Sequence, residues 1–139
     1  MTSSDLHSKV AVVPGGSGGI GSAICRRLAE AGARVFIGYN SSPDAARSLA
    51  QKLVGSGHAA IAMPVTDSDG MMKARQQVQE LAGRLDLVVN CAGTTRFVPH
   101  GDLDALDDEL ISRILDVNVR GVIVSSRAFV PLLRQSGGG

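Results

Sequence analysis

Five of the chain's 17 glycines fall within residues 14–21, which read PGGSGGIG. The segment follows the β-branched run 9–13 and leads, at Gly19, into a helical pattern. A glycine turn between a strand and a helix N-terminus is typical of a phosphate site, because backbone N–H groups and the helix dipole point at the anion. Residues 16–21 fit the G-x-G-x-x-G spacing of dinucleotide-binding loops. A phosphate-hydrolysing P-loop would need Lys where Ser22 stands, so that class is excluded, and five glycines disfavour a merely tight turn.

Polar side chains follow the second β-rich run, residues 34–38. Asn40, Ser41 and Ser42 come there, and no acidic residue stands before Asp44. An acidic residue at this point would bind the ribose 2′-hydroxyl of NAD and disfavour the 2′-phosphate of NADP. The three polar side chains can donate hydrogen bonds to a phosphate, so we predict NADP, with NAD as the alternative cofactor. The simpler interpretation is a turn and helix cap.

Two asparagines occupy positions that a ligand could reach. Asn90 closes the fourth predicted strand, at the carboxyl end where open α/β sheets bind their ligands. Ala92 and Gly93 follow it and allow a close approach to the backbone. Asn118 interrupts an apolar helical stripe. From the residues alone, Asn90 is equally well a strand terminator, and Asn118 a partly buried amide with its hydrogen bonds made.

The cysteines and histidines predict neither a metal site nor a disulfide framework. Cys25 and Cys91 lack the short paired spacing of zinc ligands, and we expect reduced thiols. The three histidines fall in terminal or loop contexts, where ordinary surface residues are expected; they are His7, His58 and His100.

Strands and helices alternate along the predicted chain. Short apolar runs predict strands at residues 9–13, 34–38, 59–63 and 85–89. Helical spacing predicts two helices over residues 19–31 and 43–53. A third is predicted from a cap within residues 66–69 to residue 82, and a fourth from about residue 106 to 133. Gly121 is expected to bend the fourth helix. The expected buried face of the first helix is Ile20, Ile24, Leu28 and Ala31, and that of the third is Ala74, Val78, Leu81 and Ala82. This order predicts an α/β fold with a parallel, doubly wound sheet.

Length and composition further limit the kinds of protein that this chain can be. A chain of 139 residues predicts one domain, and 44% hydrophobic residues exclude disorder as the main state. A formal net charge of +1 gives no excess of positive charge that would favour binding to nucleic acid or an anionic membrane. The N-terminus has no apolar signal region, and no apolar run approaches the ~20 residues that span a bilayer. We therefore expect a cytoplasmic protein with a small-molecule ligand.

Three motifs together resemble the short-chain dehydrogenase/reductase family. They are Gly15-x-x-x-Gly19-Ile20-Gly21, the segment 90–93 (NCAG) and the segment 116–121 (DVNVRG). The resemblance implies a Rossmann-type sheet with strand order 3-2-1-4. It also implies an NAD(P)(H)-dependent oxidoreductase that interconverts a carbonyl and an alcohol, similar to 3-oxoacyl reductases. Homo-oligomers are implied too, through the long helix, whose further apolar positions include Ile123 and Val124.

The same resemblance implies a role for each matching residue. The pyrophosphate would lie on Gly15, Ser17, Gly18, Gly19, Ile20 and Gly21. The adenosine ribose would meet Asn40, Ser41 and Ser42, with Val65 packed on the base, and the nicotinamide ribose would meet Asn90, Ala92 and Gly93. Asn118 would serve in the proton relay. Three positions depart from the family's pattern, namely Pro14, Cys91 and Pro64, the last replacing the side chain that usually contacts adenine.

The catalytic Tyr-x-x-x-Lys and Ser of that family have no counterpart among the 139 residues. The sole tyrosine, Tyr39, is followed four positions later by Pro43. The resemblance therefore covers the first, nucleotide-binding half, over residues 1–139. We expect an incomplete domain that is inactive alone, with a flexible end at 136–139 and an apolar fourth strand at the sheet edge. The alternative is a non-catalytic dinucleotide- or partner-binding module; a methyltransferase is disfavoured because its site also needs an acid after the second strand.

Overall fold

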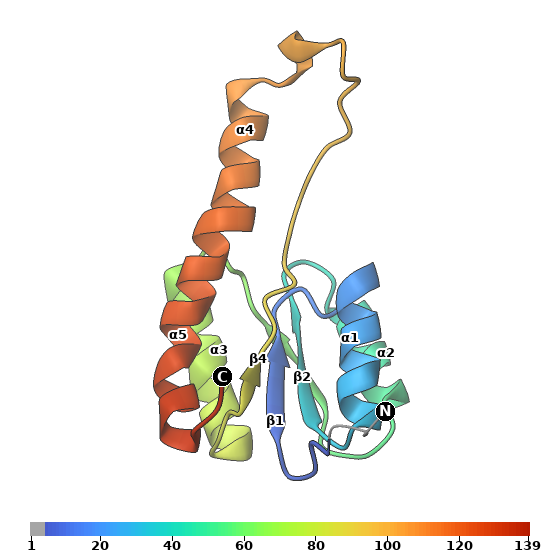
Figure 1. Cartoon of the computed structure of the whole chain (residues 1–139), viewed down its shortest axis with the longest axis vertical. Coiled ribbons are helices and arrows are strands. Elements are labelled where there is room, and N and C mark those ends of the chain that lie inside the picture. Colours follow the sequence, from blue (N-terminus) through green and yellow to red (C-terminus); the bar gives the residue numbers. More distant parts are fainter. Residues whose placement is uncertain (1–4) are drawn as a thin grey trace.

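Four parallel strands form one sheet in the computed structural model, which describes residues 5–139 (Figure 1). The strands are β1 (Val10–Val13), β2 (Arg34–Tyr39), β3 (Ala59–Ala62) and β4 (Leu87–Val88). Their order is β3-β2-β1-β4, and every neighbouring pair is parallel. This confirms the predicted α/β class and the 3-2-1-4 order. β1 lies inside the sheet, and all four of its residues are buried, as the continuous apolar run requires.

Helices cover both faces of the sheet. Figure 1 shows α1 and α2 on one face and α3 and α5 on the other. The helices are α1 (Gly19–Glu30), α2 (Pro43–Lys52), α3 (Ser68–Ala82), α4 (Asp108–Leu115) and α5 (Gly121–Ser136). A 3₁₀ turn, Leu103–Ala105, precedes α4. No helix within residues 5–139 is long and apolar enough to cross a bilayer.

Successive β2 side chains point into two separate cores. Val35 and Ile37 pack with Cys25 and Ala46 on the face that α1 and α2 cover. Phe36, between them, packs with Phe129 and other residues on the α3 and α5 face. Alternation along a strand explains this division, because adjacent side chains leave a sheet on opposite faces. The sheet is thereby buried on both sides, which fixes its carboxyl edge relative to the surrounding helices.

The buried face of α1 agrees with the prediction in part, since Ile24 and Leu28 pack partly buried against the core. Gly21, Cys25 and Ala29 face the core, and the predicted core residue Ile20 is 77% exposed. The glycine loop decides this rotation: a Cβ on Gly21 would collide with the carbonyl oxygen of Gly15, so the helix must turn its glycine side toward the loop. Leu81 of α3 was likewise expected inside and is half exposed.

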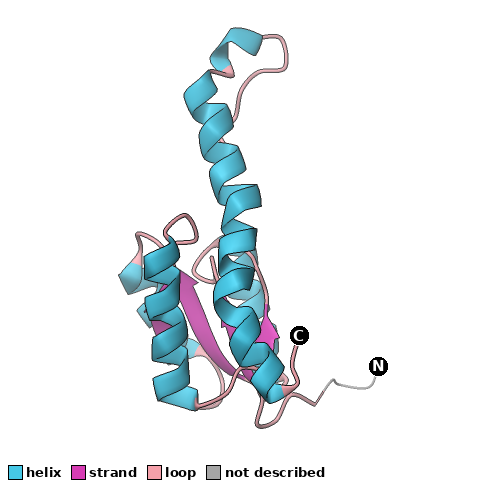
Figure 2. Cartoon of the chain, turned by 90° about the vertical axis from the view of Figure 1, so that its left-hand side faces the viewer, coloured by secondary structure: helices cyan, strands magenta, loops and turns pink. Residues whose placement is uncertain are grey.

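The long predicted helix is a single rod with a widened turn in its middle. α4 runs through a π-helical turn, Asp116–Arg120, into α5, and α4 projects beyond the sheet (Figure 2). The sequence predicted a bend at Gly121, and the structure has the π-helical turn directly before it. A Cβ on Gly121 would come within 2.8 Å of Val65 Cγ2. Gly121 therefore permits close packing of the rod on the segment that follows β3. π-turns are uncommon and occur often at functional sites.

Asp86 anchors the amino end of the sheet. Its carboxylate, 4% exposed, accepts hydrogen bonds from the Val10 N–H (2.9 Å), from Arg84 (2.6 and 2.8 Å) and from Lys9 (3.3 Å). The hydrogen bonds from Arg84 are the main cause that lowers the pKa of Asp86 from 3.8 to about 2, against the opposing effect of burial. Because the loss of either partner would leave a buried charge uncompensated, this pairing ties the starts of β1 and β4 together.

The last residues of the chain, where a flexible end was predicted, form backbone hydrogen bonds with β4 and the residue before it. The Gly139 N–H donates to the Asp86 carbonyl (2.9 Å), and the Val88 N–H donates to the Gly139 carbonyl (3.2 Å). Backbone groups at the outer side of β4 are therefore hydrogen-bonded to residue 139. Gly137, with φ +68°, ends α5 and turns the chain back toward the strand.

His58 was predicted to be an ordinary surface residue and instead joins two elements. Its Nδ1 accepts a hydrogen bond from the Val35 N–H (3.0 Å), and its Nε2 lies 2.9 Å from the Val54 carbonyl oxygen. The imidazole thus links the residues after α2 to β2. Such a pairing depends on the tertiary structure, because Val35 lies 23 residues away in the chain.

Candidate functional site

A groove of about 850 Å³ runs along the carboxyl edge of the sheet. Its wall contains all six residues predicted in the glycine loop, all three after β2, and Val65, Ala92 and Gly93. These residues, predicted from the sequence, thus lie together at the edge where parallel α/β sheets bind ligands. Within residues 5–139 no group of three His, Cys, Asp or Glu side chains is arranged to hold a metal ion.

The glycine loop is held closed by contacts that only glycine permits. Gly15 has φ +78°, and a Cβ on it would lie 2.5 Å from the Ala92 nitrogen. Gly16 and Gly18 close tight turns through N–H bonds to the carbonyls of Val13 (2.8 Å) and Gly15 (3.1 Å). The loop therefore packs directly on the segment after β4, and the two predicted motifs form one wall.

The N-terminus of α1 opens into the groove. Gly18 is its N-cap and supplies no side chain to satisfy the first N–H groups of the helix. A Cβ on Gly19 would meet nothing within 4 Å, so this glycine leaves space rather than avoiding a collision. Exposed N–H donors, a helix dipole and an empty approach together make this end suited to a phosphate group.

The strand end after β2 carries only neutral polar side chains. Asn40, Ser41 and Ser42 line the groove, and no hydrogen bond to their side chains is formed by residues 5–139. The nearest acid in the sequence, Asp44, lies on α2 beside Arg47 (3.5 Å) and is not part of the wall. The site thus offers donors and no negative charge at this end.

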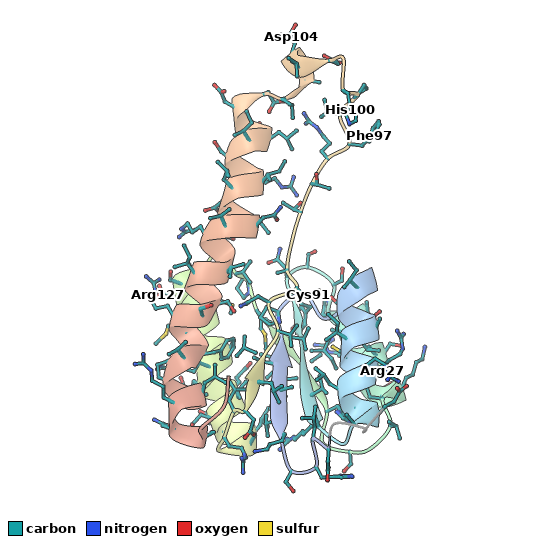
Figure 3. All side chains as sticks on the ribbon, in the orientation of Figure 1. Arg27, Cys91, Phe97, His100, Asp104 and Arg127 are labelled. Carbon is teal, nitrogen blue, oxygen red and sulfur yellow. The ribbon has the colours of Figure 1, made fainter. Side chains whose placement is uncertain are left out.

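Only part of the segment that follows β4 lines the groove. Cys91, Ala92 and Gly93 lie on the wall, whereas the predicted Asn90 is exposed and does not. Figure 3 labels Cys91 at the carboxyl edge of the sheet, between α1 and the rod. The wall thus begins one residue later in this segment than the sequence predicted, at Cys91 rather than Asn90.

Asn118 lies behind the groove rather than on its wall. Its Oδ1 accepts the Thr94 N–H (2.7 Å), and its Nδ2 donates to the Thr94 carbonyl (2.9 Å). Both halves of the amide are therefore committed to the backbone of a residue that does line the groove. The π-helical turn places the amide opposite Thr94, so in this structure Asn118 positions the wall.

Several wall residues were missed by the sequence analysis. They are Met63, Thr66, Thr94, Arg113, Asp116 and Val117. Arg113 and Asp116 bring the only formal charges among the lining residues within the described part of the chain. Asp116 stands inside a quoted motif, and Arg113 precedes it by three residues, so their shared helical face was the available signal.

The thiol of Cys25 is buried, whereas that of Cys91 is partly exposed. Cys25 is fully buried under the loop, and that burial is the main cause that raises its pKa to about 11. Its Sγ lies 3.8 Å from the Gly16 carbonyl oxygen, a contact that supports the loop. Cys25 is therefore a packing residue, since reactive thiols need a stabilised thiolate.

The family model described as short chain dehydrogenase matches residues 9–139. The chain belongs to the short-chain dehydrogenase family. An uncharacterized oxidoreductase of Methylorubrum extorquens is 37% identical, over 96% of this chain and 54% of its own length. Versicolorin reductase of Emericella nidulans is 34% identical, over 99% of this chain and 53% of its own length. The resemblance drawn from the three motifs is confirmed, and the chain spans about half the length of the curated relatives it matches.

Solved structures of short-chain dehydrogenases share the observed fold. A short chain dehydrogenase of Burkholderia cenocepacia, crystallised in complex with NADP, superposes with a TM-score of 0.84 at 40% identity. The match covers 93% of this chain and 52% of that one. Because the family consists of oxidoreductases, the oxidoreductase class predicted from the motifs is supported at the level of the family.

Proposed function

We propose that the groove binds NADP(H), as the cofactor site of an oxidoreductase that interconverts a carbonyl and an alcohol. The observation that carries the proposal is the continuity of one wall from Asn40–Ser42, past the open N-terminus of α1, to Ala92 and Gly93. A dinucleotide needs such a path, because its pyrophosphate joins two nucleosides on opposite sides of the loop. The Burkholderia cenocepacia relative, bound to NADP, supports the assignment.

Each part of the wall has a proposed task. The first N–H groups of α1 hold the pyrophosphate, and the space above Gly19 admits it. Neutral donors of Asn40, Ser41 and Ser42 bind the 2′-phosphate, with NAD as the alternative cofactor. Val65 packs on the base, and Ala92 and Gly93 lie beside the nicotinamide ribose, whereas the exposed Asn90 lies off the wall. Asn118 holds Thr94 in place (2.7 and 2.9 Å) and is its positioning residue.

NADP(H) should bind more tightly than NAD(H). Hydrogen bonds to a charged group contribute roughly 1.5–3 kcal/mol, so we expect a preference of about tenfold or more. Asn40→Asp should reverse the preference, because the new carboxylate repels the 2′-phosphate and accepts from a 2′-hydroxyl. Calorimetric titration of both cofactors measures this. Gln51→Glu, an exposed position on α2 away from the wall, adds the same charge and should change nothing. Equal or tighter NAD binding by the unmodified chain contradicts the proposal.

The 139-residue chain should reduce no carbonyl compound above the uncatalysed rate. The bound nicotinamide would supply the hydride, and the alkoxide formed needs a proton donor, worth typically 10²–10⁴-fold in rate. Tyr39, the sole tyrosine, packs in the α1–α2 core and is absent from the groove wall. The amide of Asn118 does not titrate near neutral pH. The measurement is NADPH oxidation with simple ketones and a 3-oxoacyl thioester, with a full-length family member as control; clear turnover would assign the acid to another residue.

We also propose that the rod mediates homo-oligomerisation. Ile111, Leu115, Val119 and Ile123 recur every four residues along it, and each is exposed. Val124, which the sequence analysis grouped with Ile123, instead packs in the core. An exposed apolar row at this spacing forms one helical face suited to a second helix. Sedimentation should show dimers or larger species, and Ile123→Lys should shift them toward monomer; monomer alone over a wide concentration range contradicts the proposal.

A non-catalytic dinucleotide-binding module is the second candidate function. Both candidates predict that this 139-residue chain binds the cofactor without turnover. The full-length relatives that are reductases favour the oxidoreductase. The cofactor, substrate and cytoplasmic location of the protein stay predictions.

A further inference from the structure

Asp116 is the one carboxylate on the groove wall within residues 5–139. It lies in the π-helical turn, and Arg120 on the same rod holds it. Arg120 Nη1 donates to Asp116 Oδ1 (2.9 Å) and to the carbonyl oxygen of Thr66 (3.0 Å). Through this bridge the carboxylate is fixed beside the residues that follow β3, although the two segments lie about fifty residues apart in the sequence.

The purine of the cofactor would lie at this end of the groove, an inference that rests on the proposed function. With the pyrophosphate on α1 and the 2′-phosphate at Asn40–Ser42, the base extends past β2 toward its outer neighbour β3. The wall there consists of the buried side chains of Met63 and Val65, and of Thr66. Apolar side chains hold the face of a base but do not distinguish the groups on its edge.

No other acidic group of the described chain reaches this wall. Asp67 follows Thr66, but its carboxylate accepts the Asp69 N–H (3.0 Å) and caps α3. The ring of Pro64 packs toward Gly70, where an added Cβ would lie 2.5 Å from Pro64 Cγ, and Pro64 does not line the groove. Among residues 5–139, Asp116 is therefore the only acceptor-only side chain on the wall that is available to the edge of the base.

We propose that Asp116 selects adenine as the purine of the bound dinucleotide. Its Oδ1 is occupied by Arg120, and its Oδ2 has no hydrogen-bond partner among residues 5–139. An ionised carboxylate only accepts hydrogen bonds. The 6-amino group of adenine donates, whereas hypoxanthine and guanine carry an acceptor oxygen at the same position. The hydroxyl of Thr66 both donates and accepts, so it does not discriminate between them.

The test compares the dissociation constants of NADP and nicotinamide hypoxanthine dinucleotide phosphate on the whole chain. The unmodified chain should bind NADP about tenfold more tightly, the size expected for one half-exposed charged hydrogen bond. Asp116→Asn should bring the two constants within about twofold, because an amide both accepts and donates. Glu109→Gln removes the same charge from an exposed position on α4 off the groove wall and should keep the ratio.

The outcomes separate this inference from the proposed function. Equal binding of both dinucleotides by the unmodified chain, or an unchanged ratio in Asp116→Asn, overturns the role of Asp116 and leaves the NADP site standing. Failure to bind either dinucleotide overturns the proposed function, and the inference with it. Thermal unfolding checks that the loss of the Arg120 pair is tolerated; if Asp116→Asn does not fold, Asp116→Ser, whose hydroxyl also donates and accepts, should give the same equal constants.

Discussion

A Gly19→Val variant should keep its fold and lose measurable dinucleotide binding. Gly19 begins α1 at the centre of the groove, and a Cβ there meets no protein atom within 4 Å. The branched side chain would instead occupy the approach of the pyrophosphate to the first N–H groups of the helix. A calorimetric titration should show at least a hundredfold weaker binding of NADP, or none, because the side chain fills the space through which the phosphate reaches the N–H donors. Circular dichroism and thermal unfolding establish that the variant is folded.

Two other glycines make that experiment specific. Gly101 also has nothing within 4 Å of an added Cβ, but it lies outside the groove, so Gly101→Val should bind like the unmodified chain. Gly21→Ala should destabilise the loop itself, since its Cβ would collide with the Gly15 carbonyl. Unchanged affinity in a folded Gly19→Val protein would show that the loop is only a turn, and would remove the main support for the cofactor site.

An Asp86→Asn variant should lose about 2 kcal/mol of unfolding free energy at neutral pH. The pKa of Asp86 falls from 3.8 to about 2 in the folded chain, chiefly through the hydrogen bonds from Arg84, and each unit corresponds to about 1.4 kcal/mol. The asparagine keeps an acceptor for the Val10 N–H but gives up the pairs with Arg84 and Lys9. Urea denaturation at neutral pH measures the difference.

The same group predicts how stability depends on pH. Because the folded pKa is depressed, the contribution is fully present above the unfolded value of 3.8 and is lost as the pH falls toward 2. The difference between the unmodified chain and Asp86→Asn should therefore shrink over this interval. Asp104→Asn, an exposed carboxylate on the projecting segment in Figure 3, is the matched control and should change stability little. An unchanged free energy in Asp86→Asn would show that the buried pairs are balanced by their own desolvation.

Local patterns were sufficient to predict the elements and the phosphate loop. The apolar runs at β1 and β2, the helical spacing of α2 and the glycines 15–21 each act within a few residues. Once four strands alternate with helices, right-handed crossovers bring their carboxyl ends to one edge. The gathering of the glycine loop, Asn40–Ser42 and Ala92–Gly93 on a common wall follows from that rule, and the structure agrees.

Side-chain partners at long range could not be predicted in this way. Asn118 bonds Thr94 from 24 residues away, His58 bonds Val35 from 23, and Arg120 bonds Thr66 from 54. The rotation of α1, which exposes Ile20, depends on contact between Gly21 and Gly15, and the groove takes in Cys91 rather than Asn90. Periodicity reports the average environment of a helix or strand face. The partner of one polar atom depends on packing between elements, because arrangements that bury similar apolar area can pair the same polar groups differently.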